Sequence, residues 1–460
     1  MELLHFVMTK ELPVATIAQV RSALQTVFHT IAEDADAELH YTRRPDSAKF
    51  SASTLIQTLV LGWLAHPDAT LPQLAQTAAR VGVFVHPQAI DQRFSFETAS
   101  LLRTVLVRSV ELLIAGDPVA IPLLQRFNGC FVHDSTTIVL PDELADHARG
   151  NGGSTSTNTS AALKCGLQLD LLTGALARLD LTDGRANDQK LPLQHAPLPP
   201  GALRLADLGF YDTGVFAELS AQGVYWLSKL PSSALISEAG QPPRKLLEFI
   251  RALGPFQQWE GAVQVGSKQL AARLLVQRVP QEVADQRRRR IRAEAKDRGQ
   301  TPSAASLELA AWTILLTNIP LELLSLEEAL ILAKVRWQIE LVFKLWKSYG
   351  LVDEWRSQKP ARVLCELYAK LLAMLVQQWF IAMGCWGYPD RSLVKAAQVI
   401  REHAPELASA RLRPERLCET LETMGVVLEQ TARMNSRSKH PNTYQLLLAL
   451  TTEEVAVGHL

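Results

Sequence analysis

The sequence of 460 residues predicts an α/β protein in which a β-sheet region lies between helical N-terminal and C-terminal regions. Apolar and polar side chains alternate over residues 163–171, and the alternation resumes over 175–181 after Thr173-Gly174. This pattern is typical of a two-stranded hairpin with one buried face. Residues 203–230 then have the pattern of a strand, a helix and a strand, whereas the residues before 125 and after 350 are predicted to be helical.

The overall composition excludes several classes of protein. It is 47% hydrophobic and 20% charged with a net charge of zero, which fits a globular chain but does not by itself indicate a nucleic-acid binder. The five cysteines are widely scattered and show no disulfide or zinc-binding spacing. The N-terminus lacks the pattern of a signal peptide, and no uncharged apolar run is long enough to cross a membrane. We therefore expect a soluble, cytoplasmic protein with no membrane partner.

Residues 1–125 are expected to form a helical DNA-binding domain. Thr70 has the pattern of a helix cap, the helix that follows meets Gly82, and a second helix is predicted to begin at Pro87. A helix, a glycine-bearing turn and a helix form the outline of a helix-turn-helix, although short helix pairs also occur in many helical domains that do not bind DNA. The polar side chains predicted to read base edges belong to Gln88, Gln92 and Arg93.

Residues 126–230 are predicted to be the first part of a catalytic core. A β-rich segment from Phe127 delivers Asp134 from a strand, the hairpin follows, and a fourth strand ends in Asp207 before a helix and a fifth strand. Three antiparallel strands, a crossover, a strand, a helix and a strand have the order of a ribonuclease-H-like fold. In that fold the last acidic residue lies on a helix after the fifth strand.

The helix predicted over residues 331–350 supplies that acidic residue, Glu340. One face of this helix is apolar, and the other holds Glu340 among three cations: Arg336, Lys344 and Lys347. A solvated face with ordinary Glu–Lys pairs would have a related pattern. The alternative is a metal-binding carboxylate beside cations that bind phosphate.

More than 100 residues separate the fifth strand from Glu340, so we expect an insertion. Residues 231–310 are predicted to be a β-rich insertion domain, 311–395 the second part of the core, and 396–460 a helical C-terminal region. The insertion carries four consecutive arginines, a pattern that is most often a solvated surface. In a protein that handles DNA they would contact phosphates; they are Arg287, Arg288, Arg289 and Arg290.

Asp134, Asp207 and Glu340 are the expected catalytic and metal-binding residues. Taken singly, an aspartate at a strand end is more often a turn or a cap, so their joint placement carries the prediction. Three converging carboxylates can hold two Mg²⁺ ions for an in-line displacement at phosphorus. Oxygen ligands without cysteine or histidine favour Mg²⁺, with Mn²⁺ as a substitute, over zinc.

These blocks resemble the insertion-sequence-four family of bacterial DDE transposases. The order Arg336, three residues, Glu340, six residues, Lys347 matches the family's Tyr-Arg-Glu-Lys signature, except that Ala333 stands where the signature has tyrosine. The similarity extends to the block at Asp134, to the block at Asp207 and to WTILLTN over 312–318, and it covers roughly residues 50–385.

The resemblance implies a DNA transposase that catalyses metal-dependent cut-and-paste transposition. It implies that Arg336, Lys344 and Lys347 grip phosphates, that Trp312 stacks on a flipped base, and that a homodimer holds two inverted-repeat ends before strand transfer to target DNA. Trp312 could equally be a core residue of an apolar strand. Two other functions stay open: a catalytically silent DNA-binding protein derived from a transposase, suggested by Ala333, and a ribonuclease-H-type nuclease outside transposition. The sequence does not disclose whether a hairpin intermediate is used.

Overall fold

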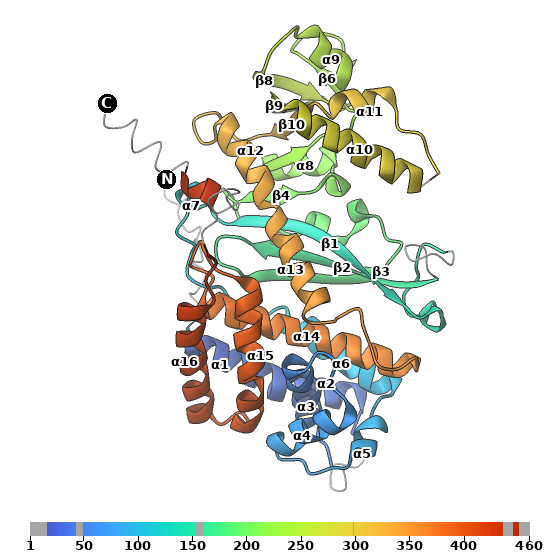
Figure 1. Cartoon of the computed structure of the whole chain (residues 1–460), viewed down its shortest axis with the longest axis vertical. Helices are drawn as coiled ribbons and strands as arrows, with labels where there is room; N and C mark the ends of the chain where they lie inside the picture. Colours follow the sequence, from blue (N-terminus) through green and yellow to red (C-terminus); the bar gives the residue numbers. More distant parts are fainter. Residues whose placement is uncertain (1–15, 43–48, 153–159, 298, 436–444, 450–460) are drawn as a thin grey trace, which may run out of the picture.

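The computed structural model describes residues 16–42, 49–152, 160–297, 299–435 and 445–449. The molecule is elongated (Figure 1). The helices of both chain ends pack together below the strands β1–β3, and the segment with β6, β8, β9 and α9–α11 lies above them. Two consecutive helices, α12 and α13, run across the sheet from the upper part to the helical part. The catalytic candidates lie in this middle layer.

The strands predicted between residues 126 and 230 all form, and they lie in one sheet. Their order is β3-β2-β1-β4-β5. β1 pairs with β2, and β2 with β3, in antiparallel directions, whereas β1–β4 and β4–β5 are parallel. The bounds are Cys130–Leu140 for β1, Ala161–Asp170 for β2, Leu176–Asp183 for β3, Leu203–Ala206 for β4 and Tyr225–Lys229 for β5.

The sheet continues through the segment that follows β5. β10 pairs with β5, and β9, β8, β6 and β7 extend the same ten-stranded sheet outward from it. The bounds are Leu235–Ser237 for β6, Arg244–Lys245 for β7, Gln258–Val265 for β8, Leu270–Arg278 for β9 and Trp312–Thr317 for β10. The helices here are α8 (Thr213–Ala221), α9 (Leu246–Ala252), α10 (Gln281–Asp297) and α11 (Ala304–Leu309). The four-arginine run therefore lies in a helix.

The N-terminal region is helical, as predicted. Its α-helices are α1 (Ile17–Gln25), α2 (Ala32–Leu39), α3 (Ala52–Ala65), α4 (Leu71–Val81), α5 (Pro87–Asp91), α6 (Phe96–Ser109) and α7 (Pro122–Gln125), with a π-helix, η1 (Thr26–Ile31), after α1. The Thr70 side chain caps α4, and Gly82 ends it with φ 104°. α5 begins at Pro87 as predicted but ends after five residues, because Ser95 caps the next helix.

The continuous helix predicted over residues 331–350 is wrong. The chain forms α12 (Leu326–Val335) and α13 (Trp337–Ser348), and a turn at Arg336 separates them. The Ile339 N–H bonds to the Arg336 carbonyl at 3.2 Å, so the first turn of α13 is tightened. The predicted apolar face is nevertheless confirmed, since Val335, Ile339, Val342 and Trp346 are all buried.

The C-terminal helices pack against the N-terminal ones around one long core helix. They are α14 (Pro360–Gly384), α15 (Leu393–Ala410) and α16 (Pro414–Thr431), and α14 contacts both α3 and α6. α14 has the length and composition of a membrane span, but 89% of its apolar window is buried inside the protein. α14 is therefore a core helix of the helical part.

Candidate active site

Asp134 and Asp207 come together because they lie on adjoining parallel strands. Asp134 is in β1, and the residue before it, His133, pairs with Ala206 at the end of β4. Asp207 follows Ala206 directly and caps a short 3-10 helix, η6 (Leu208–Phe210), by accepting a hydrogen bond from the Gly209 N–H. The sheet thus fixes both aspartates at one edge of the β1–β4 pair.

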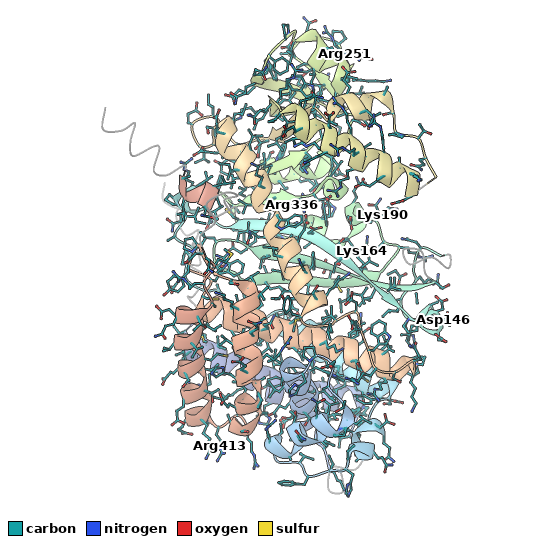
Figure 2. All side chains as sticks on the ribbon, viewed as in Figure 1. Asp146, Lys164, Lys190, Arg251, Arg336 and Arg413 are labelled. Atoms are coloured by element: carbon teal, nitrogen blue, oxygen red, sulfur yellow. The ribbon has the colours of Figure 1, made fainter. Side chains whose placement is uncertain are left out.

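Glu340 reaches Asp134 from α13, which packs on β1. The Arg336 guanidinium lies between the two carboxylates: Nη1 donates to Asp134 Oδ2 at 2.9 Å, and Nη2 donates to Glu340 Oε1 at 2.5 Å. Figure 2 labels Arg336 where α12 meets α13, over the sheet. Because the chain turns at Arg336, its side chain bridges two carboxylates from different elements.

The site concentrates negative charge in a partly buried place. The pKa of Asp134 is raised to about 6, chiefly by burial and in smaller part by the nearby charges of Asp207 and Glu340. The Arg336 guanidinium and the Ser135 N–H oppose these effects. A low-dielectric environment and neighbouring carboxylates both disfavour the ionised form of Asp134. A bound cation would lower the free-energy cost of ionising Asp134.

The donor set fits a divalent metal ion. The groups are carboxylate oxygens, which Mg²⁺ and Mn²⁺ prefer, and the Arg336 guanidinium is a positive charge already placed between two of them. No three acidic, histidine or cysteine side chains in the described residues are already close enough to form a metal site. Arg336 holds Asp134 and Glu340 in this arrangement, and the convergence of the three acidic residues on a metal site stays a prediction.

The two lysines predicted beside Glu340 lie farther along α13. Lys344 is exposed to solvent. Lys347 donates to the Thr137 carbonyl of β1 at 2.8 Å and lies 4.0 Å from the Asp353 carboxylate. The Lys344 ammonium is thus exposed and could bind a ligand without rearrangement. The Lys347 ammonium already holds α13 to β1.

A further cation, Lys229, lies at the site and was not predicted from the sequence. It is the last residue of β5, the strand next to β4. Burial lowers its pKa, as do the positive charges of Arg336 and Arg287, while Asp207 and Glu340 act in the opposite direction. In the sequence, Lys229 is marked only by its position at the end of the predicted strand that follows Asp207.

Ala333, which stands where the family signature has tyrosine, lies near Lys229. Ala333 lines a small cavity of about 20 Å³ together with Lys229, Arg336 and the ends of β4, β5 and β10. Trp337, four residues after Ala333, is 53% exposed. An aromatic side chain is therefore present near Arg336, at another position.

The residues predicted from the insertion are mostly engaged within the protein. The Trp312 ring packs on Phe256, with centroids 4.7 Å apart. Arg287 donates to the Trp312 carbonyl and to Thr313, and Arg288 donates to the Leu307 carbonyl and to Asp285. The side chains of Arg289 and Arg290 are exposed, and Arg290 pairs with Glu294.

The residues predicted for base reading lie on and just after α5. Gln88 and Gln92 are exposed, and Arg93 is half-buried. Asp91 between them pairs with Lys359 and Arg362, which connects α5 to the start of α14. The predicted glutamine side chains are therefore at the surface. Ion pairs hold α5 to the start of α14, the helix that follows α13 in the chain.

Comparisons with known proteins identify the family of the chain. Residues 125–376, more than half of the chain, match the family described as "Transposase DDE domain". The chain therefore belongs to the DDE transposase family, and it is an enzyme that acts on DNA. Members of this family generally use divalent metal ions, which agrees with the carboxylate site.

Its relatives specify the group within that family. The chain is 26% identical over 371 residues to the transposase for insertion sequence element IS231E of Bacillus thuringiensis subsp. finitimus, covering 75% of each chain. It is 24% identical over 443 residues to the IS231F transposase of B. thuringiensis subsp. israelensis, covering 90% of this chain and 91% of the relative. The IS1151 transposase of Clostridium perfringens is 24% identical over 342 residues, covering 68% and 71%. The predicted bacterial insertion-sequence-four type is confirmed.

Proposed function

We propose that this transposase performs cut-and-paste transposition with Asp134, Asp207 and Glu340 as the metal-binding catalytic residues. The observation that carries the proposal is the Arg336 bridge between Asp134 and Glu340, beside an aspartate on the adjoining strand. The Arg336 guanidinium already pairs with carboxylates from two elements, β1 and α13, and Asp207 follows the strand next to β1. Two Mg²⁺ ions, or Mn²⁺ ions, would replace the guanidinium.

The first five strands are proposed to be a ribonuclease-H-like core, completed by β10 and the helices up to residue 395. The order β3-β2-β1-β4-β5 and the two parallel pairs at β4 support this assignment. The proposed domains are a DNA-binding region over 1–125, core segments over 126–230 and 311–395, an insertion over 231–310 and a C-terminal region over 396–460.

The chain's own residues then have separate tasks. Bound ions would activate a water or a 3′-hydroxyl and stabilise the leaving oxygen at phosphorus. Asp134 must be deprotonated to bind them, and Arg336 must leave the two carboxylates. The released guanidinium can then hold a DNA phosphate through paired N–H donors. Lys344 and Lys347 would neutralise neighbouring phosphates along the same helix.

The proposed partners are the terminal inverted repeats of an insertion sequence, the target DNA and a second copy of the chain. Exposed Arg289 and Arg290 would contact the DNA backbone, and Gln88, Gln92 and Arg93 would contact the terminal repeat. Trp312 would need to leave Phe256 before it could stack on a base. We place the protein in the bacterial cytoplasm, associated with the nucleoid.

A cleavage assay tests this proposal. Linear DNA carrying the element's inverted repeats is incubated with the protein and Mg²⁺, Mn²⁺ or EDTA. We expect strand breaks at the repeat ends with either metal and none with EDTA or with Asp134→Ala. The control is Glu406→Gln, which removes an exposed carboxylate from α15. If wild type binds the repeats but is as inert as Asp134→Ala, the chain is a silent DNA-binding derivative, an alternative suggested by Ala333.

A further inference from the structure

Arg204 is a buried arginine on the strand that leads to Asp207. It lies in β4, three residues before Asp207, and it is 1% exposed. Asp207 continues the extended backbone of β4. Successive side chains along extended backbone alternate between the two faces of a sheet, so Arg204 and Asp207 lie on opposite faces. The guanidinium of Arg204 is therefore placed behind the acidic site.

A hydrogen bond joins Arg204 to the residue next to Asp134. Arg204 Nε donates to His133 Nδ1 at 3.1 Å. His133 is completely buried in β1 and directly precedes Asp134, so the two side chains point to opposite faces of the sheet. Burial and the charges of Arg204 and Arg178 lower the pKa of His133, so the ring is neutral and Nδ1 can accept.

Gln194 connects the same guanidinium to the segment after Asp207. Arg204 Nη2 donates to Gln194 Oε1 at 2.5 Å, and Gln194 Nε2 donates to the Phe210 carbonyl at 3.0 Å. Gln194 is buried in η5 (Pro192–His195), a 3-10 helix between β3 and β4. Phe210 ends η6, the 3-10 helix that Asp207 caps. A buried chain of three hydrogen bonds therefore runs from β1 to the turn that orients Asp207.

Stability of the fold alone does not explain a cation at this place. The described residues give the Arg204 guanidinium no carboxylate partner, and its Nη1 and the His133 Nε2 make no hydrogen bond with them. Burial lowers the pKa of Arg204 to about 10 in spite of the opposing charge of Asp212. Buried charges and unpaired polar atoms cost free energy, and apolar side chains of similar volume are often at least as stable. Since the backbone already pairs β1 with β4, what the arginine adds is direction, because hydrogen bonds restrict both distance and angle.

We propose that Arg204 is a positioning residue that fixes the spacing of Asp134 and Asp207. It acts on the first aspartate through His133 and on the second through Gln194 and η6. The inference rests on the proposed metal site, and it adds a residue from the other face of the sheet. Residues that bind a metal ion must be held within about 0.5 Å of the productive geometry by packed and hydrogen-bonded neighbours.

Mn²⁺ binding to the full chain with a duplex of the terminal repeat, followed by electron paramagnetic resonance, tests the proposal. Arg204→Met keeps an unbranched side chain but removes its donors. We expect the Mn²⁺ affinity to fall by about tenfold or more, while the affinity for the duplex in EDTA stays unchanged. The rate of single-turnover cleavage at saturating DNA should fall as well, since the DNA-binding surface is untouched.

Two substitutions of His133 separate the hydrogen bond from the volume of the ring. His133→Asn keeps an acceptor near the position of Nδ1 and should bind Mn²⁺ like wild type. His133→Leu removes the acceptor and should weaken Mn²⁺ binding as Arg204→Met does.

Gln194→Met breaks the second link and leaves the arginine in place, so it carries the test if Arg204→Met or His133→Leu does not fold. It should also weaken Mn²⁺ binding. Because members of one hydrogen-bonded network are not additive, the double variant Arg204→Met, Gln194→Met should bind Mn²⁺ no more weakly than Arg204→Met alone.

Arg391 provides the matched control. It is 3% exposed, lies in the connection between α14 and α15, and donates to the Trp386 and Tyr388 carbonyls. Arg391→Met should lower the melting temperature and leave the Mn²⁺ affinity unchanged.

The outcomes separate this inference from the proposed function. If wild type binds Mn²⁺, Asp207→Asn abolishes binding, and both Arg204→Met and Gln194→Met bind like wild type, the inference is wrong and the proposed metal site stands. If Arg391→Met weakens Mn²⁺ binding as much as Arg204→Met at an equal loss of melting temperature, the effect is one of stability and the inference is again wrong. If wild type itself binds no Mn²⁺ with or without the duplex, the proposed metal site fails and the inference falls with it.

Discussion

Two arginines in this protein each bridge a pair of carboxylates, and their surroundings differ. Arg336 joins Asp134 to Glu340 in the active-site region. Arg362 joins Asp91 of α5 to Glu366 of α14, 3.1 Å and 3.0 Å away. In the second group Lys370 adds another cation 3.6 Å from Glu366 and also donates to the Leu351 and Glu354 carbonyls.

The two groups differ in how their carboxylates are paired with cations. Around Arg362, two carboxylates face three cations, because Lys359 also pairs with Asp91. Around Arg336, one guanidinium bridges Asp134 and Glu340, and Asp207 makes no ion pair with the described residues. The first network holds the N-terminal helices to the segment after α13. The second leaves Asp207 without an ion pair near two carboxylates that share one cation, an arrangement suited to binding a metal ion.

The largest expected effect is on catalysis. Asp207→Asn should reduce strand cleavage at the inverted repeats at least about a hundredfold, because a metal-binding oxygen and its charge are lost. The free energy of unfolding without metal should not decrease, since one repelling charge is removed. Single-turnover cleavage and urea denaturation measure the two quantities. A variant that loses stability in parallel with activity would contradict the assignment.

The next effect compares the two arginines directly. Arg362→Met should lower the free energy of unfolding by about 3 kcal/mol, because Glu366, only 2% exposed, loses a charged partner. Arg336→Met should cost less than about 1 kcal/mol with saturating Mg²⁺, because an ion would replace the guanidinium. Urea unfolding with Mg²⁺ and with EDTA measures both. Equal losses in both conditions would make Arg336 an ordinary structural residue.

A third effect concerns pH in the absence of divalent ions. The pKa of Asp134 is raised to about 6 in the folded protein, from an ordinary value of 3.8. Between these values the folded state binds more protons than the unfolded state, so stability decreases as pH rises from 4 to 6. The contribution of Asp134 to this decrease should be on the order of 2 kcal/mol. Asp134→Asn should remove it, which the difference between the two pH–stability curves would reveal.

The smallest effect is on DNA binding. Lys344→Ala should reduce the slope of log affinity against log salt by about 0.9, the value for one phosphate contact. Lys334→Ala, which removes an exposed lysine from α12, is the matched control. Fluorescence anisotropy with a terminal-repeat duplex at several salt concentrations measures both slopes. Identical slopes for wild type and Lys344→Ala would remove Lys344 from the DNA interface.

Much of the fold could be predicted because its signals are local. The alternation over residues 163–181 specified β2 and β3, and Thr70, Gly82 and Pro87 marked the ends of α4 and the start of α5. The break at Arg336 could not be predicted, since residues 331–350 contain neither proline nor glycine before Gly350. Packing of α12 and α13 against different strands decides it.

The site was predicted in part for the same reason. Asp134, Asp207 and Glu340 stood in segments whose order along the chain indicated a meeting point. Lys229 has no local pattern that distinguishes it from other lysines. Its place at the site depends on the pairing of β5 with β4, which the local sequence does not specify.

The sequence by itself indicated the class of protein, the succession of the first five strands along the chain and three acidic candidates, because periodicity, caps and motif spacing are properties of neighbours in the chain. Tertiary structure decided the charge balance. It places Arg336 between two carboxylates from different elements. Electrostatic energy depends on distance and burial, and residues 134, 207 and 340 acquire both only when β1, β4 and α13 pack together.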